Sequence, residues 1–309
     1  MRDPPFRYKF AKSVLNETYH RQMGQNGPAM TQLRHPIAEE EILAYERDGV
    51  VCIRDQFDAD TVENALQVCL DHFNSGSKTL VQAGDSDGGT GLTTVSTHMA
   101  RQNPRFMNIA RTSPAAEIAA RLMRLDEVRY FYDQLFIKDP GTQAPTDWHH
   151  DLPFWPFAGN HIASVWIALT PVTQENSGLV YVGGSHLSDT IYRPDPAPPR
   201  ENFWRGDAAS LPPCPAFHKE FDNPDYRFLS WDMEPGDCLV HHPLTVHGAG
   251  KNSSLEQRRV GLSIRYFGGD AKWADCRTAF TVPGTEDGAG LEVGKPPAND
   301  DIFPIVWRA

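Results

Sequence analysis

The feature that most constrains the fold is a succession of short β-rich runs in the second half of the chain. Between residues 128 and 267, these runs are separated by glycine, proline, asparagine and aspartate, which is the pattern of strands joined by turns. No helical segment alternates regularly with them, so a parallel βαβ sheet is not indicated. We therefore predict a mainly β protein with a helical buttress, built as an antiparallel jelly roll or barrel.

The first part of the chain carries the helical signals. Residues 38–49 begin with acidic side chains and end at a glycine, which indicates a short helix. A strand is expected over residues 50–57 and a second helix over residues 59–73, where apolar residues recur at helical spacing. Residues 84–91 are rich in glycine and aspartate and indicate a loop, and a third helix fits residues 115–125.

The domain organisation follows from these patterns. Residues 37–282 form one predicted domain, with an N-terminal arm of residues 1–36 and a C-terminal tail of residues 283–309. A proline-rich stretch of residues 192–221 interrupts the strand pattern. A loop of this length inside a compact domain is usually functional, so we predict that it forms a lid.

The composition indicates which classes of molecule the protein binds and where in the cell it is located. A formal net charge of -11 argues against nucleic acid or an anionic membrane as the main partner and favours a small-molecule substrate. The five cysteines are scattered, without a CxxC pair, as in a reduced chain. Because no signal peptide and no run of about 18 apolar residues are seen, we expect a cytoplasmic protein.

The stretch TDWHHDLPFWPF, residues 146–157, points to a metal site. Charged and imidazole side chains are costly to hold among aromatic residues unless something satisfies them. On an extended segment His149 and Asp151 point to the same side, while His150 points away. We expect the aromatic residues that follow, Phe154, Trp155 and Phe157, to form either core or substrate wall, with wall favoured.

A third metal ligand is expected from the stretch LVHHPLTVHGAGKN, residues 239–252, which contains His241, His242 and His247. Two imidazoles and one carboxylate that leave coordination positions open are the ligand set of non-haem Fe(II) oxygenases. The same residue types also suit Zn²⁺ or Mn²⁺. We expect His242 to make a structural or indirect contact and His241 to be peripheral.

An arginine pair opens the strand RRVGLSIRYF, residues 258–267. Alternation places Arg258 on one face with Val260, Leu262, Ile264 and Tyr266, and Arg259 on the other face. We predict that the apolar face lines the barrel interior, so that Arg258 points inward and needs a partner. A bidentate carboxylate would suit its guanidinium; the alternative is a structural salt bridge to a carboxylate of the protein.

Three motifs together resemble the phytanoyl-CoA dioxygenase family: WHHD at 148–151, NSGLVYVGGSH at 176–186, and HPLTVHGAGKN at 242–252 with Arg258 beyond it. The resemblance spans roughly residues 40–270. It implies a double-stranded β-helix and dependence on Fe(II) and 2-oxoglutarate.

The resemblance also implies roles for individual residues. His149, Asp151 and His247 would bind the iron and carry the catalytic centre. Arg258 would bind the far carboxylate of 2-oxoglutarate, and Trp166 and Gln134 would line the cosubstrate pocket. The sequence departs from some members at Ala249, where they have a serine that contacts the cosubstrate. Because Asp151 is intact, halogenation is not expected.

The motifs and the resemblance together predict a dioxygenase. It would consume O₂ and 2-oxoglutarate, oxidise a C–H bond of a small organic metabolite and release succinate and CO₂. A secondary-metabolite intermediate is favoured as substrate, because no basic cluster indicates a nucleotide phosphate site. Hydroxylation, desaturation, cyclisation, epimerisation and endoperoxidation are all open as outcomes. The alternatives from other classes are a Zn or Mn cupin-type hydrolase or isomerase and a non-catalytic jelly-roll binding protein.

Overall fold

A computed structural model describes residues 32–84, 91–193, 211–274, 282–285 and 289–309. Most of the predicted N-terminal arm, residues 85–90 of the predicted loop and the centre of the predicted lid lie outside the described residues. None of the described helices is long and apolar enough to cross a lipid bilayer.

The helices begin and end close to where their signals predicted. They are α2 (Glu39–Asp48), α3 (Ala59–Asn74), α4 (Pro104–Thr112) and α5 (Ala115–Leu122). Gly49 ends α2 in the left-handed conformation with φ 72°, and its amide donates to Tyr45, as a C-terminal glycine cap requires. The Asp58 side chain accepts from the Thr61 amide at the start of α3. Helix α4 was not predicted from the sequence.

A long antiparallel sheet carries the fold, in the order β1-β10-β7-β12-β4-β3-β2, with β14 pairing with β4. The strands are β1 (Val50–Ile53), β2 (Val81–Gly84), β3 (Leu92–Thr97), β4 (Glu127–Lys138), β7 (Ile162–Ala168), β10 (Cys238–His241), β12 (Arg259–Phe267) and β14 (Ile305–Arg308). Strand β12 lies between β4 and β7, at the centre of the sheet.

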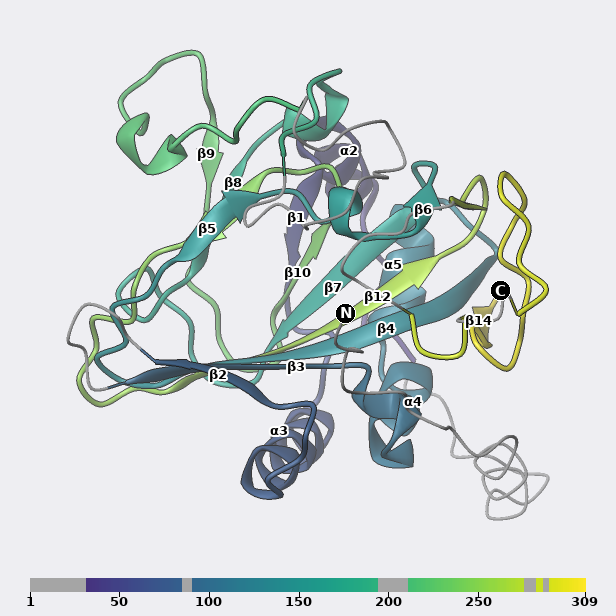
Figure 1. The fold of residues 1–309 in the computed structure, drawn as a ribbon, viewed down its shortest axis with the longest axis horizontal. Coiled ribbons are helices and arrows are strands. Elements are labelled where there is room, and N and C mark those ends of the chain that lie inside the picture. Colours follow the sequence, from purple (N-terminus) through teal and green to yellow (C-terminus); the bar gives the residue numbers. More distant parts are fainter. Residues whose placement is uncertain (1–31, 85–90, 194–210, 275–281, 286–288) are drawn as a thin grey trace, which may run out of the picture.

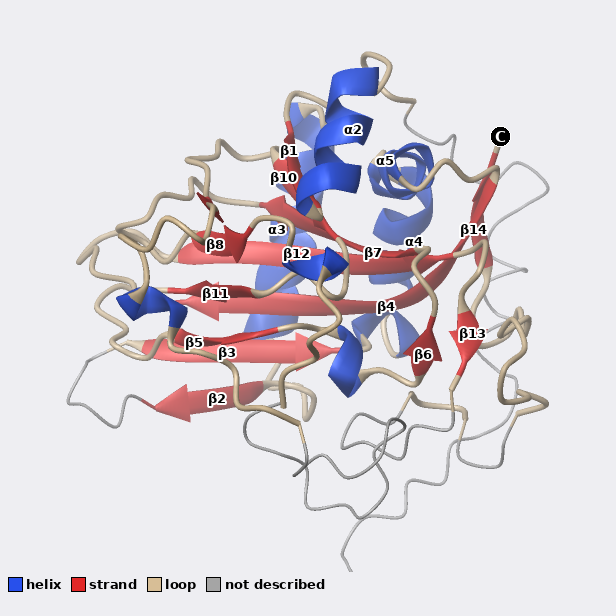
Figure 2. Cartoon of the chain, turned by 90° about the horizontal axis from the view of Figure 1, so that it is seen from above, coloured by secondary structure: helices blue, strands red, loops and turns tan. Residues whose placement is uncertain are grey.

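A smaller sheet faces part of the long one, in the order β5-β11-β8-β9. Its strands are β5 (Thr146–His149), β8 (Leu179–Val182), β9 (Phe228–Leu229) and β11 (His247–Ala249), and a separate pair is formed by β6 (Phe157–Ala158) and β13 (Lys272–Trp273). The helices lie on the opposite side of the long sheet (Figures 1 and 2). Two facing antiparallel sheets with helices outside are the predicted jelly roll with its helical buttress.

The main apolar core lies between the long sheet and the helices. It includes Val260, Leu262 and Ile264 of β12, which are at most 1% exposed, together with Ile109 of α4 and Ile118 of α5. The apolar face of β12 therefore packs against helices. This arrangement leaves the other face of the strand for the space between the two sheets.

The C-terminal residues are part of this fold. β14 pairs with β4, and Phe303, which is fully buried, packs with Phe131 and Phe157. The predicted boundary at residue 282 is therefore wrong for the last residues of the chain. The strand was missed because IVWR is too short to show a period.

Candidate metal centre and its cavity

The three predicted metal ligands come together between the two sheets. His149 ends β5 and His247 begins β11, and the two residues are opposite one another in the pairing of these strands. Asp151 follows His149 by two residues, at the start of a short turn. One ligand atom from each residue lies within 4.8 Å of the others, so a single metal ion can reach all three.

Hydrogen bonds orient both imidazoles. The Nδ1 of His149 lies 2.7 Å from the Asp147 carbonyl oxygen, and the Nδ1 of His247 lies 3.0 Å from that of Thr245. A ring nitrogen that faces a carbonyl oxygen must carry the proton, which leaves each Nε2 as a lone-pair donor. Burial, followed by the charges of His149 and His241, holds the pKa of His247 well below its usual range. His247 is therefore a neutral imidazole that is ready to bind a metal.

The Asp151 carboxylate is buried and ionised. Burial alone would raise its pKa, but hydrogen bonding from His241 and the charge of Arg265 outweigh that effect and lower the pKa well below its usual value. The Ser164 hydroxyl donates to Oδ2 at 3.2 Å, and the Nε2 of His241 lies 3.3 Å from the same oxygen. Two imidazoles and one ionised carboxylate fit a divalent iron ion.

His241 is closer to the centre than the sequence predicted. It was expected to be peripheral, yet it is buried, lines the cavity and contacts Asp151. The expectation was wrong because β10 ends at His241, where pairing with Ser164 of β7 turns this side chain toward the space between the sheets. His242 lies outside the cavity, and its Nδ1 accepts from the Leu244 amide, consistent with a structural role.

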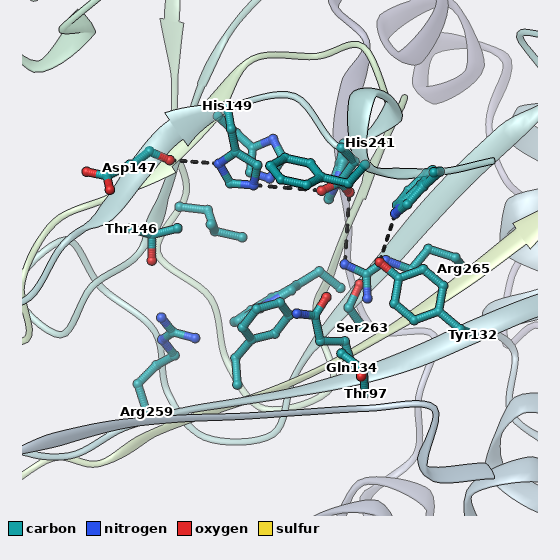
Figure 3. A pocket seen from close by; sticks show the side chains of 17 residues that line it. Thr97, Tyr132, Gln134, Thr146, Asp147, His149, His241, Arg259, Ser263 and Arg265 are labelled. Carbon is teal, nitrogen blue, oxygen red and sulfur yellow. Dashed lines mark hydrogen bonds and ion pairs between the residues drawn. The ribbon is translucent and has the colours of Figure 1, made fainter. Parts of the chain in front are cut away.

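A cavity of about 400 Å³ opens beside the three ligands (Figure 3). Residues from both sheets line it: Thr97, Tyr132, Gln134, Phe136, Thr146, Asp147, His149, Asp151, Phe154, Trp155, Trp166, Leu179, His241, His247, Arg259, Ser263 and Arg265. Phe154 and Trp155 thus contribute to its wall as favoured, whereas Phe157 lies in the core. His150 faces away from the cavity, and its Nε2 accepts from the Tyr192 amide at 2.8 Å.

The predicted orientation of Arg258 is wrong. Its side chain is 43% exposed, its Nε donates to Asp139 at 2.7 Å, and its guanidinium lies 5.3 Å from the centre of the Phe73 ring of α3. Alternation along the strand was assigned correctly, but the apolar face packs against the helices. The arginine that lines the cavity is Arg259, which is 3% exposed.

Arg259 lies at one end of the cavity floor (Figure 3). Its guanidinium is 5.5 Å from the centre of the Trp166 ring, and its Nη2 donates a long hydrogen bond of 3.5 Å to the Ser177 hydroxyl. Burial lowers its pKa to about 10, so it is charged at neutral pH. No carboxylate of the described residues forms an ion pair with Arg259, which leaves this buried cation for a ligand.

Trp166 and Gln134 both line the cavity, the location that the sequence predicted for them. Ser263 of β12 is opposite Gln134 on one side and Trp166 on the other. Gly261 makes room for the indole, because an added Cβ would lie 2.1 Å from a ring carbon of Trp166. The sequence offered Arg259, Gly261 and Ser263 as one strand face but gave no sign that this face bordered a ligand space.

Comparison with known sequences identifies the family. The sequence model of the phytanoyl-CoA dioxygenase family matches residues 45–260. A probable phytanoyl-CoA dioxygenase of Caenorhabditis elegans is 31% identical over 125 residues, which are 40% of this chain and 36% of that protein. The peroxisomal phytanoyl-CoA dioxygenase of Rattus norvegicus is 30% identical over 128 residues, 40% of this chain and 34% of the relative. The matched regions thus cover about a third of these relatives.

Solved structures share the fold. The epimerase SnoN, determined in complex with Fe³⁺, alpha-ketoglutarate and nogalamycin RO, superposes with a TM-score of 0.67 at 25% identity over 87% of this chain and 98% of SnoN. EctD from S. alaskensis in its apo form gives 0.61 at 17% identity, over 87% of this chain and 90% of EctD. The predicted jelly-roll class is confirmed, and the predicted iron and 2-oxoglutarate are both present in the SnoN structure. By the extent of the sequence match, this chain belongs to the phytanoyl-CoA dioxygenase family.

Proposed function

We propose that the protein is an Fe(II)- and 2-oxoglutarate-dependent dioxygenase that oxidises a C–H bond of a small organic metabolite and releases succinate and CO₂. One observation carries the proposal: a cluster of two histidines and one aspartate borders a cavity whose floor ends in the buried guanidinium of Arg259, which has no carboxylate partner among the described residues. Family membership and the SnoN complex support the same chemistry.

In this proposal His149, Asp151 and His247 hold the iron from one side and leave the cavity side free. Bound iron supplies the activation of O₂ that is coupled to decarboxylation of 2-oxoglutarate. Arg259 takes the role that the sequence had suggested for Arg258 and pairs with the far carboxylate of the cosubstrate. Trp166 supports the Arg259 guanidinium from below, and Gln134 lies beside the cosubstrate.

The other groups exclude water and fix the ligand geometry. His241 and Ser164 hold Asp151 through its Oδ2, while Phe154 and Trp155 cover the cavity with apolar surface. A hydrolase on the same ligands would have no use for a buried cation at Arg259, so the oxygenase is favoured over zinc or manganese hydrolysis. The four cysteines in the described part of the chain are free, which supports a reducing, cytoplasmic location.

The proposed substrate is a small metabolite. SnoN is an epimerase from nogalamycin biosynthesis. The similarity to it supports a secondary-metabolite intermediate as the substrate, and it supports keeping outcomes other than hydroxylation in the proposal. The cavity volume of about 400 Å³ is within the usual range for sites that bind small organic ligands.

The test is an anaerobic titration of the protein with Fe(II) and 2-oxoglutarate, followed by visible absorption. A metal-to-ligand charge-transfer band is expected when both bind together. Asp151→Ala should abolish the band while circular dichroism shows a folded protein. A folded wild-type protein that takes up iron but gives no band would contradict the proposal and redirect attention to zinc or manganese chemistry.

A further inference from the structure

Arg265 is a second buried arginine on the cavity face of β12. It is 3% exposed and lines the cavity. Figure 3 shows Arg259 and Arg265 at opposite ends of the cavity, with His149 and His241 above and between them. The two arginines are six positions apart on an extended strand, which corresponds to about 20 Å between their Cα atoms.

The Arg265 guanidinium makes no hydrogen bond to any residue of the described chain. Its Nε and Nη1 are buried without a partner, and its Nη2 lies 3.9 Å from Oδ2 of Asp151, beyond hydrogen-bond distance. A buried donor that lacks an acceptor is costly, and a buried charge is more so. Arg265 therefore needs an acceptor that the described residues do not provide.

The charges at the site with Fe(II) and 2-oxoglutarate bound indicate which kind of acceptor Arg265 needs. Fe(II) and the guanidiniums of Arg259 and Arg265 bring four positive charges. Asp151 and the two carboxylates of 2-oxoglutarate bring three negative charges. Among the buried groups one positive charge is left over, since Asp147, the other carboxylate of the lining, is exposed. Arg265 is the cation that the short five-carbon cosubstrate cannot reach while it is bound to Arg259.

The surroundings of Arg265 are aromatic. Its guanidinium lies 4.4 Å from the centre of the Tyr132 ring and 5.8 Å from that of Trp155. The Trp155 indole N–H donates to the Tyr132 hydroxyl at 3.0 Å, which fixes both rings. Phe154 continues this wall. A ligand beside Arg265 would thus pair an acidic oxygen with the guanidinium and lay an apolar body against the rings.

We infer that Arg265 binds an anionic oxygen group of the substrate, a carboxylate carried on a flat apolar ring system, on the side of the metal centre away from Arg259. The inference rests on the proposed function, because it assigns 2-oxoglutarate to Arg259. It adds a substrate class: aromatic or polycyclic acids rather than neutral or cationic metabolites.

The experiment uses 2-naphthoate and methyl 2-naphthoate as probes. Both have the same ring, but only the first carries a charge. Their dissociation constants are measured by anaerobic calorimetry on the protein loaded with Fe(II) and saturating 2-oxoglutarate, which occupies the Arg259 end. The wild-type protein is expected to bind 2-naphthoate at least about tenfold more tightly than the ester.

The decisive variants are Arg265→Met, Arg265→Lys and the surface control Arg258→Met. Arg258→Met should keep the preference for the acid, Arg265→Lys should keep part of it, and Arg265→Met should remove it. The variants are compared at Fe(II) and 2-oxoglutarate concentrations that saturate the charge-transfer band of each. If Arg265→Met does not fold, Arg265→Lys still has to show a reduced preference.

Three results would overturn the inference: no preference in the wild-type protein, an unchanged preference in both Arg265 variants, or loss of the charge-transfer band in Arg265→Met. The last result would make Arg265 a positioning residue for Asp151. Failure of the proposed function looks different, because the wild-type protein would then give no band. Acid and ester can still be compared on that protein without metal.

Discussion

The two faces of β12 are both buried, yet they are built from opposite kinds of residue. Val260, Leu262, Ile264 and Tyr266 pack against the helices. On the other face, Arg259, Ser263 and Arg265 line the cavity, and all three carry buried polar atoms without a hydrogen-bond partner among the described residues. The apolar face packs against other residues of the protein. The polar atoms of the other face have to find their hydrogen-bond partners in the cavity. Apolar patterning therefore identifies the core of a jelly roll and not its active-site face.

The largest effect expected from this difference is on stability. Leu262 is fully buried in the core, so Leu262→Ala should lower the free energy of unfolding by about 2–5 kcal/mol. Its neighbour Ser263 has a buried hydroxyl without a partner, so Ser263→Ala should change that free energy by less than about 0.5 kcal/mol. Urea unfolding measures both. Equal losses would show that the cavity face is packed like the core.

The next largest effect is expected on the affinity for 2-oxoglutarate. Arg259→Met should weaken 2-oxoglutarate binding by roughly 30-fold or more, because a buried charge pair is worth about 2–5 kcal/mol. Arg258→Met should change the affinity less than about twofold, since Arg258 is half-exposed and paired with Asp139. Titration of the charge-transfer band gives both affinities. A larger loss of 2-oxoglutarate affinity in Arg258→Met than in Arg259→Met would support the inward orientation of Arg258 that the sequence had suggested.

A smaller effect is expected at Gly261, which separates the two polar ends of the cavity face. A Cβ at this position would lie 2.1 Å from the Trp166 ring, so Gly261→Ala must displace the indole that supports Arg259. Overpacking of this kind costs about 1–3 kcal/mol. We expect 2-oxoglutarate affinity to fall several-fold while metal binding is kept. Tryptophan fluorescence should shift, and an unchanged emission spectrum would contradict the close packing of Gly261 and Trp166.

Local patterns were enough to predict His149 and Asp151 as candidate metal ligands and most of the elements, whereas His247 was chosen among three histidines by the family resemblance. His149 and Asp151 are two residues apart, and a motif of that length is readable without knowledge of the fold. The end of α2 at Gly49 and the start of α3 at Asp58 follow from capping chemistry in the same way.

The predictions that were wrong depended on how the strands pair and on which face of the long sheet the helices cover. Whether Arg258 or Arg259 borders the ligand depends on which face of β12 the helices cover, and the strand sequence does not state that. His241 was misjudged because its direction is set by pairing with Ser164 on β7, 77 residues earlier in the chain. β14 was missed because it gains its stability from β4 and from the Phe131 cluster, not from its own pattern.

The last prediction concerns Lys138, opposite Arg259 in the pairing of β4 with β12. Burial, with a further contribution from the charge of Arg259, lowers the pKa of Lys138 to about 7, while Asp147 acts in the opposite direction. Its Nζ donates to the carbonyl oxygens of Ala144 and Gly250, contacts that the neutral amine can keep in part. A lysine whose pKa is lowered on folding binds fewer protons in the folded state than in the unfolded state between pH 7 and about 10.5. Stability must therefore rise with pH across that window and level off below pH 7.

We expect the wild-type protein to gain about 1–2 kcal/mol between pH 7 and pH 9, relative to Lys138→Met over the same range. The comparison stops at pH 9 because buried tyrosines and thiols, whose pKa values are raised, begin to act in the opposite direction above it. Urea unfolding at several pH values checks the slope, with Lys251→Met as an exposed control that should keep the wild-type slope. Binding of 2-oxoglutarate should flatten the wild-type dependence, since its carboxylate at Arg259 would favour the charged lysine. A slope that survives in Lys138→Met would show that other groups cause the pH dependence, and would contradict a lowered pKa of Lys138.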